Sequence, residues 1–188
     1  MAEISSIQGF SSSKPLEKGL VQVFTGEGKG KTSAALGGVL RALGNGLRVC
    51  IITFMKKGRP SGEWEVLSKM PDVRIARFGS GAFVKPGNVN PEAVEQAEQA
   101  LTLAREAAFS GNYDLIMLDE INVAAAWELI ELDDVLRLIQ DKPVNVELIL
   151  TGRQADARLI ELADLVTECA KIKHPYDKGI KARRGIEF

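Results

Sequence analysis

A short stretch near the start of the chain has the residue types and spacing needed to hold a row of phosphates. Glycines alternate with polar residues from Gly26 to Gly30, and Lys31 and Thr32 follow directly. Glycines let successive backbone N–H groups turn toward an anion, and a helix N-terminus adds partial positive charge. The lysine can reach phosphate oxygens, and the threonine hydroxyl can bind Mg²⁺. The stretch therefore predicts a polyphosphate site. The candidate contacts are Gly26, Glu27, Gly28, Lys29, Gly30, Lys31, Thr32 and Ser33.

The spacing of this stretch is that of a shortened P-loop. The pattern G-x-x-x-x-G-K-[ST] would place its first glycine at position 25, but Thr25 stands there and Gly26 follows. The loop from Gly26 to Gly30 is therefore one residue short. The alternative is a glycine-rich turn that binds nothing. Such a turn would not need the lysine–threonine pair that begins the helix. The short loop leaves open which phosphates bind and for which reaction.

Two acids end an apolar segment further along the chain. Residues 113–118 read as a buried strand, and Asp119 and Glu120 follow it. An acid at the end of a strand downstream of a P-loop usually holds Mg²⁺ directly or through water. The alternative is that the two acids merely end the strand. Reasoning from the residues alone does not separate Asp119 from Glu120.

Further candidates lie in loops that should face the same crevice. Arg153 follows a predicted strand and could contact phosphate or another ligand, or be an ordinary surface arginine. The polar loop 56–63 carries three cations that could pair with phosphates or simply face solvent. In the loop 79–87, Phe83 and Val84 could face a ligand or pack into the core.

The elements that must position these residues alternate between strand and helix. Apolar runs predict strands at 20–24, 48–54, 73–78, 113–118, 146–150 and 165–169. Helical spacing predicts helices at 31–43, around 64–67, and at 91–109, 132–140 and 156–163. The alternation predicts a three-layer α/β fold with a parallel sheet wrapped by helices. With the P-loop, the expected fold class is P-loop NTPase-like (RecA-like). The expected organisation is a flexible N-terminal arm at 1–18 and a single domain at 19–188.

Composition narrows the function classes. The 188 residues carry a formal net charge of −1, which gives no bulk basicity for nucleic-acid binding. Cys50 and Cys169 both lie in apolar runs without metal-type spacing and are expected to be reduced core thiols. His174 is the only histidine, which excludes a histidine-based metal cluster. No apolar run approaches the ~18 residues of a membrane span, and no signal pattern opens the chain. The expected location is the cytoplasm.

Taken together, these motifs resemble the P-loop type of corrinoid adenosyltransferase (ATP:cob(I)alamin adenosyltransferase). The resemblance covers roughly residues 19–188, and the short P-loop with the C-terminal ending are its most specific parts. It is carried by the segments 26–33, 41–46, 119–122, 151–153, 163–168, 173–174, 179–182 and 185–188.

The resemblance implies a reaction and its participants. The 5′-deoxyadenosyl group of ATP is transferred to the Co(I) of a reduced corrinoid, cobalamin or cobinamide, and triphosphate leaves. Mg²⁺, a homodimer and a flavoprotein reductant are implied as well. The competing classes are a P-loop phosphohydrolase or kinase, for which a full-length loop is expected, and a non-catalytic nucleotide or corrinoid carrier.

The resemblance also implies residue roles. Arg41 contacts the ATP phosphates, and Glu120 rather than Asp119 is the acid linked to the metal held by Thr32. Arg153 is a candidate ATP contact from its position in the chain. Phe83 and Asn122 face the corrinoid, and the N-terminal arm orders over it. One segment departs from the family. Where a G-x-G-F-x-W type loop is common, residues 79–84 read Gly-Ser-Gly-Ala-Phe-Val, with a single aromatic shifted by one position.

Overall fold

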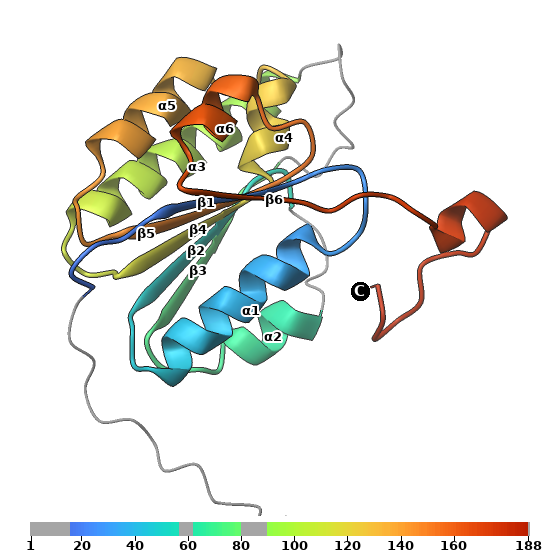
Figure 1. Ribbon diagram of the computed structural model, residues 1–188, viewed down its shortest axis with the longest axis horizontal. Coiled ribbons are helices and arrows are strands. Elements are labelled where there is room, and N and C mark those ends of the chain that lie inside the picture. The colour runs from blue at the N-terminus through green and yellow to red at the C-terminus, as the bar shows by residue number, and fades with distance from the viewer. Residues whose placement is uncertain (1–15, 57–61, 80–89, 188) are drawn as a thin grey trace, which may run out of the picture.

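The computed structural model describes residues 16–56, 62–79 and 90–187 (Figure 1). The predicted N-terminal arm lies almost entirely outside this part of the chain, as do Phe83 and Val84. Within the described ranges, no helix has the length and apolar character to cross a membrane.

The described strands form one parallel sheet of six, in the order β3-β2-β4-β5-β1-β6. They are β1 (Val21–Thr25), β2 (Val49–Thr53), β3 (Val73–Arg77), β4 (Leu115–Asp119), β5 (Glu147–Thr151) and β6 (Leu165–Glu168). Every residue of β2 and β4 is buried, which explains their near-continuous apolar sequences. The register pairs Thr53 with Asp119 and Phe24 with Thr151, so the carboxyl ends of neighbouring strands meet at one edge.

Helices cover both faces of the sheet and make the three predicted layers (Figure 1). One face carries α1 (Lys31–Gly44) and α2 (Gly62–Leu67). The other carries α3 (Pro91–Phe109), α4 (Ile121–Ala126), α5 (Leu132–Asp141) and α6 (Ala157–Leu162). The last helical turn, η1 (Pro175–Lys178), lies in a C-terminal segment that projects away from the sheet (Figure 1).

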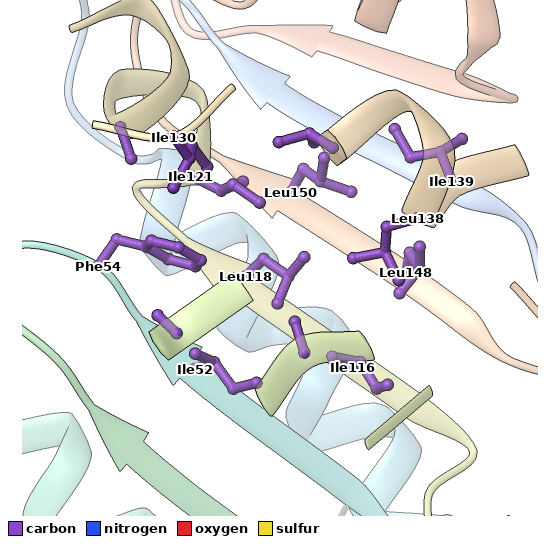
Figure 2. Packing of buried hydrophobic residues seen from close by; sticks show 14 of the residues in the cluster. Ile52, Phe54, Ile116, Leu118, Ile121, Ile130, Leu138, Ile139, Leu148 and Leu150 are labelled. Carbon is purple, nitrogen blue, oxygen red and sulfur yellow. The ribbon is translucent and has the colours of Figure 1, made fainter. Parts of the chain in front are cut away.

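The core consists of two apolar clusters, one on each side of the sheet. Because side chains alternate along a strand, Ile52 packs toward α3 while its neighbour Ile51 packs toward α1. Figure 2 shows the larger cluster, in which strand residues meet α5 and the start of α4. Its labelled members are Ile52, Phe54, Ile116, Leu118, Ile121, Ile130, Leu138, Ile139, Leu148 and Leu150.

The structure confirms the predicted elements and, besides the turn η1, adds one helix that was not predicted. Asn90 caps α3 as expected: its side chain accepts a hydrogen bond from the Glu92 backbone N–H, and Pro91 opens the first turn. The added element is α4, which begins directly after Glu120. Its six residues are too few to show a helical period in the sequence.

Both cysteines are free thiols, but the predicted core position is wrong for the second one. Cys50 is a fully buried free thiol, but Cys169 is only half-buried. It directly follows β6, an edge strand on which Leu165 and Val166 are exposed by 43% and 41%. The apolar run there belongs to an open edge of the sheet and not to the core.

Candidate active site

The predicted phosphate loop connects β1 to α1, as its sequence required. Gly30 has a φ of 121°, a region that side chains rarely adopt, and it starts the helix without a side-chain cap. No acidic residue lies in the first turn of α1, so the positive end of the helix dipole is uncompensated. This combination favours an anion at the loop.

The glycine at position 28 is required by a contact that the sequence does not reveal. Its N–H donates to the Cys169 carbonyl at 2.6 Å, where the chain leaves β6 and passes along the loop. A Cβ at this position would lie 2.5 Å from the Ala170 carbonyl oxygen. The chain after β6 therefore forms one wall of the loop.

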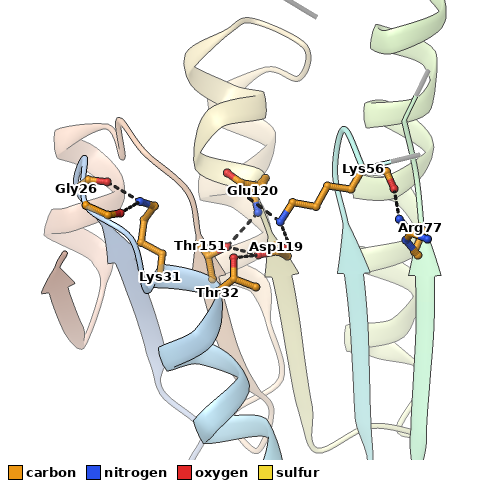
Figure 3. A network of polar contacts seen from close by, with 9 residues as sticks. Gly26, Lys31, Thr32, Lys56, Arg77, Asp119, Glu120 and Thr151 are labelled. Atoms are coloured by element: carbon orange, nitrogen blue, oxygen red, sulfur yellow. Dashed lines mark hydrogen bonds and ion pairs between the residues drawn. The ribbon is translucent and has the colours of Figure 1, made fainter. Parts of the chain in front are cut away.

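Lys31 lies inside the loop. Its Nζ atom donates to the carbonyl oxygens of Gly26 at 2.7 Å and Gly28 at 2.6 Å (Figure 3), and the residue is buried. Burial, followed by the nearby charge of Arg153, lowers the pKa of the lysine from its ordinary value. The loop backbone thus holds the ammonium inside the loop.

Asp119 organises the centre of the site from a fully buried position. Its Oδ1 atom accepts hydrogen bonds from the hydroxyls of Thr32 at 2.8 Å and Thr151 at 2.7 Å (Figure 3). Its Oδ2 atom accepts from Lys56 Nζ at 2.6 Å. One carboxylate thereby joins the start of α1 to the ends of β2, β4 and β5.

Glu120 has different surroundings from its neighbour. Its backbone is left-handed (φ 67°, ψ 16°), its N–H donates to the Thr151 hydroxyl, and its side chain is 25% exposed. The carboxylate lies 3.4 Å from Lys56 Nζ. The structure thus separates the two acids: Asp119 is enclosed by three donors, whereas Glu120 opens toward solvent.

The donors in this site fit a magnesium ion that completes its shell elsewhere. Thr32, Asp119 and Glu120 offer only oxygen atoms, the ligands that Mg²⁺ prefers. Within the described residues, no group of three or more His, Cys, Asp or Glu side chains could hold a metal on its own. Such a site suits an ion that takes its other ligands from phosphates and water.

Arg153 and Glu27 bridge the loop after β5 and the phosphate loop. The guanidinium lies 3.1 Å from the carboxylate, and both side chains are more than half exposed. Since β5 lies between β1 and β4 in the sheet, Arg153 is placed in the predicted crevice. Ser33 is exposed on the first turn of α1.

One predicted contact lies away from this cluster, and another is buried beside it. Arg41 is ten residues beyond Lys31 in α1, about 15 Å along the helix. There it lines a separate hollow with Gln22 and Glu147. Asn122 is 1% exposed, and its amide donates to the carbonyls of Phe24 and Gly152. That arrangement ties the end of β1 to the loop after β5 and does not favour direct contact with a corrinoid.

Two contacts of the site were not predicted. Lys56 was expected to contact phosphates or solvent, yet its ammonium contacts the carboxylates of Asp119 and Glu120, here called the acid pair. Although burial alone lowers the pKa of Lys56, the charges of Asp119 and Glu120 outweigh it and raise the pKa. Lys29, predicted to contact ATP, lies 3.2 Å from Glu187 and 3.3 Å from the Ile186 carbonyl. The contact of Lys56 could be predicted only from the order of the strands in the sheet. The contact of Lys29 could be predicted only from the course of the C-terminal segment.

The fold and the site define a P-loop protein of the three-layer α/β class. A family model described as ATP:corrinoid adenosyltransferase BtuR/CobO/CobP matches residues 17–188. The chain therefore belongs to the ATP:corrinoid adenosyltransferase family, which confirms the predicted family and the assignment as an enzyme.

Similar proteins support the same assignment. A corrinoid adenosyltransferase of Sinorhizobium sp is 38% identical over 180 residues, covering 94% of this chain and 84% of that protein. A corrinoid adenosyltransferase of Escherichia coli K12 is 32% identical over 172 residues, covering 92% and 87%. A crystal structure of a KaiC-like protein from Pyrococcus horikoshii matches with a TM-score of 0.55 and 18% identity, over 80% of this chain and 73% of that one. The last match concerns the fold alone.

Proposed function

We propose that this protein transfers the 5′-deoxyadenosyl group of ATP to the Co(I) of a reduced corrinoid, cobalamin or cobinamide, and releases triphosphate. The observation that carries the proposal is the meeting of Lys31, the uncapped start of α1 and the Thr32–Asp119–Glu120 oxygens at one edge of the sheet, in a chain of this family. In this reaction the cobalt electron pair forms the bond to C5′. The bond from C5′ to oxygen breaks, and the triphosphate leaves with its electrons.

The work of the protein is alignment and charge stabilisation. The Co(I) substrate is itself the nucleophile, so the protein need not supply a serine, cysteine or histidine. Lys31 and the loop N–H groups face the charge that grows on the leaving triphosphate. Mg²⁺, held by Thr32 and Glu120 with Asp119 orienting the threonine, would neutralise further phosphate charge. Arg153 is proposed as another phosphate contact.

The corrinoid and partner assignments are also proposals. Phe83 and the N-terminal arm would cover the corrinoid. For Arg41 to contact ATP as the resemblance implies, the nucleotide would have to extend about 15 Å along α1 from Lys31. A homodimer is supported by apolar side chains left exposed along the edge strand and the segment after it, namely Leu165, Val166, Ile172, Tyr176, Ile180 and Ile186. A flavoprotein would supply the electron for Co(I). A cytoplasmic location is consistent with the two free thiols.

One incubation tests the reaction. The protein is given ATP, Mg²⁺ and chemically reduced cobalamin, and the loss of cob(I)alamin absorbance is followed while the released anion is identified. Adenosylcobalamin and triphosphate in equal amounts are expected. Orthophosphate in place of triphosphate would indicate a phosphohydrolase, and binding without product would indicate a carrier.

A further inference from the structure

Lys56 places a positive charge on the two carboxylates of the proposed metal site. Its Nζ atom lies 2.6 Å from Asp119 Oδ2 and 3.4 Å from Glu120 Oε1 (Figure 3). The Asp119 side chain is fully buried, while a third of the Lys56 side chain (33%) is exposed. The ammonium therefore covers the solvent side of the acid pair.

The backbone of Lys56 is held on both sides. Its N–H donates to the Phe78 carbonyl at 2.9 Å, and its own carbonyl accepts from the Arg77 guanidinium at 2.9 Å (Figure 3). Met55, with a φ of 57°, turns the chain as it leaves β2. Because Thr53 is level with Asp119 in the sheet, a side chain just beyond β2 is in reach of the acids. The fold therefore places the backbone of Lys56 within a side chain's reach of the two acids.

The partners of Asp119 are divided between its two oxygens. Both threonine hydroxyls bind Oδ1, and the lysine binds Oδ2. A divalent cation on the same carboxylates would have to share them with the ammonium, and charges of like sign at such short range repel strongly. A metal ion bound to Asp119 and Glu120 would therefore have to displace Lys56.

We propose that Lys56 is a tethered counter-ion that keeps the acid pair from binding a divalent cation in the absence of nucleotide. The inference rests on the proposed function, in which Thr32 and Glu120 hold Mg²⁺. A polyphosphate in the loop offers the ammonium another anionic partner at the same edge of the sheet. Lys56 then moves from the carboxylates to the phosphates, and the metal takes its place. The lysine makes the site specific for a metal that arrives with nucleotide over a free metal ion.

The test measures Mn²⁺ binding to the full-length, nucleotide-free protein by electron paramagnetic resonance of the free ion. The changes Lys56→Met and Lys56→Gln should each tighten Mn²⁺ binding at least about tenfold, because a unit charge beside the carboxylates is removed. Lys56→Arg keeps the charge and should bind Mn²⁺ as weakly as the unchanged protein. The matched control is Lys69→Met, which removes the same charge from an exposed pair with Glu65.

Unchanged Mn²⁺ affinity in the Lys56→Gln protein would overturn the proposal. That variant keeps an amide donor for Asp119, so it tests the idea even where Lys56→Met does not fold. Adding Glu120→Gln to Lys56→Gln should abolish the gain, and a gain that persists would place the ion elsewhere and also overturn it. Adenosyl transfer by the unchanged protein is measured separately. If the protein is active but the Lys56 variants bind Mn²⁺ no more tightly, only the proposed role of Lys56 is overturned. If the variants bind Mn²⁺ more tightly but the protein shows no transfer, only the proposed reaction is overturned.

Discussion

At the scale of single residues, the site is divided between groups that face the substrate and groups that hold those groups in place. Lys31 lies between two loop carbonyls, and Glu120 opens to solvent. Asp119 is enclosed and connects Thr32, Thr151 and Lys56. Residues of the first kind should affect turnover alone, whereas Asp119 should affect stability as well.

Lys31→Ala should lower turnover by on the order of 10²-fold or more, because it removes a positioned charge from the growing triphosphate. The measurement is the steady-state rate of cob(I)alamin loss with saturating ATP. Lys69→Ala, on an exposed pair away from the loop, should keep the normal rate. A near-normal rate in the Lys31 variant would contradict its proposed role.

The two neighbouring acids should respond differently to the same substitution. Asp119→Ala leaves two hydroxyls and an ammonium without their buried acceptor and should cost about 2–4 kcal/mol in the free energy of unfolding. Glu120→Ala should change that free energy by less than about 0.5 kcal/mol, since its side chain is largely free of buried partners. Both should lose turnover. Urea unfolding of the two variants is the measurement, and equal losses of stability would contradict the division of roles.

At the scale of elements, a glycine in the loop and a glycine in α1 differ in whether the structure leaves room for a side chain. A Cβ on Gly28 would lie 2.6 Å from the Cys169 carbonyl oxygen, whereas one on Gly37 in α1 would meet open space. The first glycine is required by close backbone approach. The second only weakens a helix.

Gly28→Ala should therefore raise the Kd for ATP by about tenfold or more, because the loop must move from its phosphate-binding shape. Gly37→Ala is the matched control and should stabilise the fold by about 0.5–1 kcal/mol. Calorimetric titration with ATP and urea unfolding measure the two effects. Normal ATP affinity in the Gly28→Ala protein would contradict this prediction, because it would show that the chain after β6 can move aside without changing the loop.

An ion pair between Arg48 and Asp114, at the amino ends of β2 and β4, makes the stability of the fold sensitive to acid. Asp114 is buried before β4 and accepts hydrogen bonds from Arg48 Nε at 3.1 Å and from the Arg48 backbone N–H at 2.8 Å. The Arg48 side chain holds the pKa of Asp114 below its ordinary value, against the opposing effect of burial. A depressed pKa in the fold means stability that is present above the unfolded pKa and lost as pH falls through the folded one.

Asp114→Asn should flatten the loss of stability below about pH 4, near the ordinary pKa of an aspartate, and lower stability at neutral pH. Urea midpoints measured across the acid range test this. Asp141→Asn, which affects an exposed pair with Arg105, should leave the slope unchanged. The same slope in the Asp114 variant and the unchanged protein would assign acid sensitivity to other groups.

The elements themselves could be predicted because their signals are local. Asn90 and Pro91 mark the start of α3, and the buried strands are read from continuous apolar runs. The contact of Lys56 with Asp119 could not be predicted, because it depends on β2 lying beside β4. The different surroundings of Asp119 and Glu120 depend on a left-handed backbone at Glu120, for which the sequence carries no clear sign. Local order is encoded in short patterns, and the site is made by distant segments.

At the scale of the whole molecule, the chain closes on its own phosphate loop. After β6 it passes Gly28, projects outward through η1, and returns to Lys29 (Figure 1). Glu187 holds the returning segment in place: it forms an ion pair with Lys29 and accepts two hydrogen bonds from the Arg183 side chain. Those contacts, with Arg183 the larger cause, lower the pKa of Glu187 to about 2, so the pair stays charged under ordinary conditions. The C-terminal segment is thereby fastened to the loop that binds phosphate.

Glu187→Gln should release this fastening without unfolding the domain, because exposed ion pairs add little to global stability. Hydrogen exchange should become faster in residues 170–187 and in the phosphate loop, while the urea midpoint stays the same. Asp177→Asn is the control, because its partner Lys171 lies within the same segment and not on the loop. Faster exchange confined to the segment would show that the loop keeps its shape unaided. Faster exchange in both would show that the C-terminal end helps to hold Lys29 and the loop ready for the triphosphate.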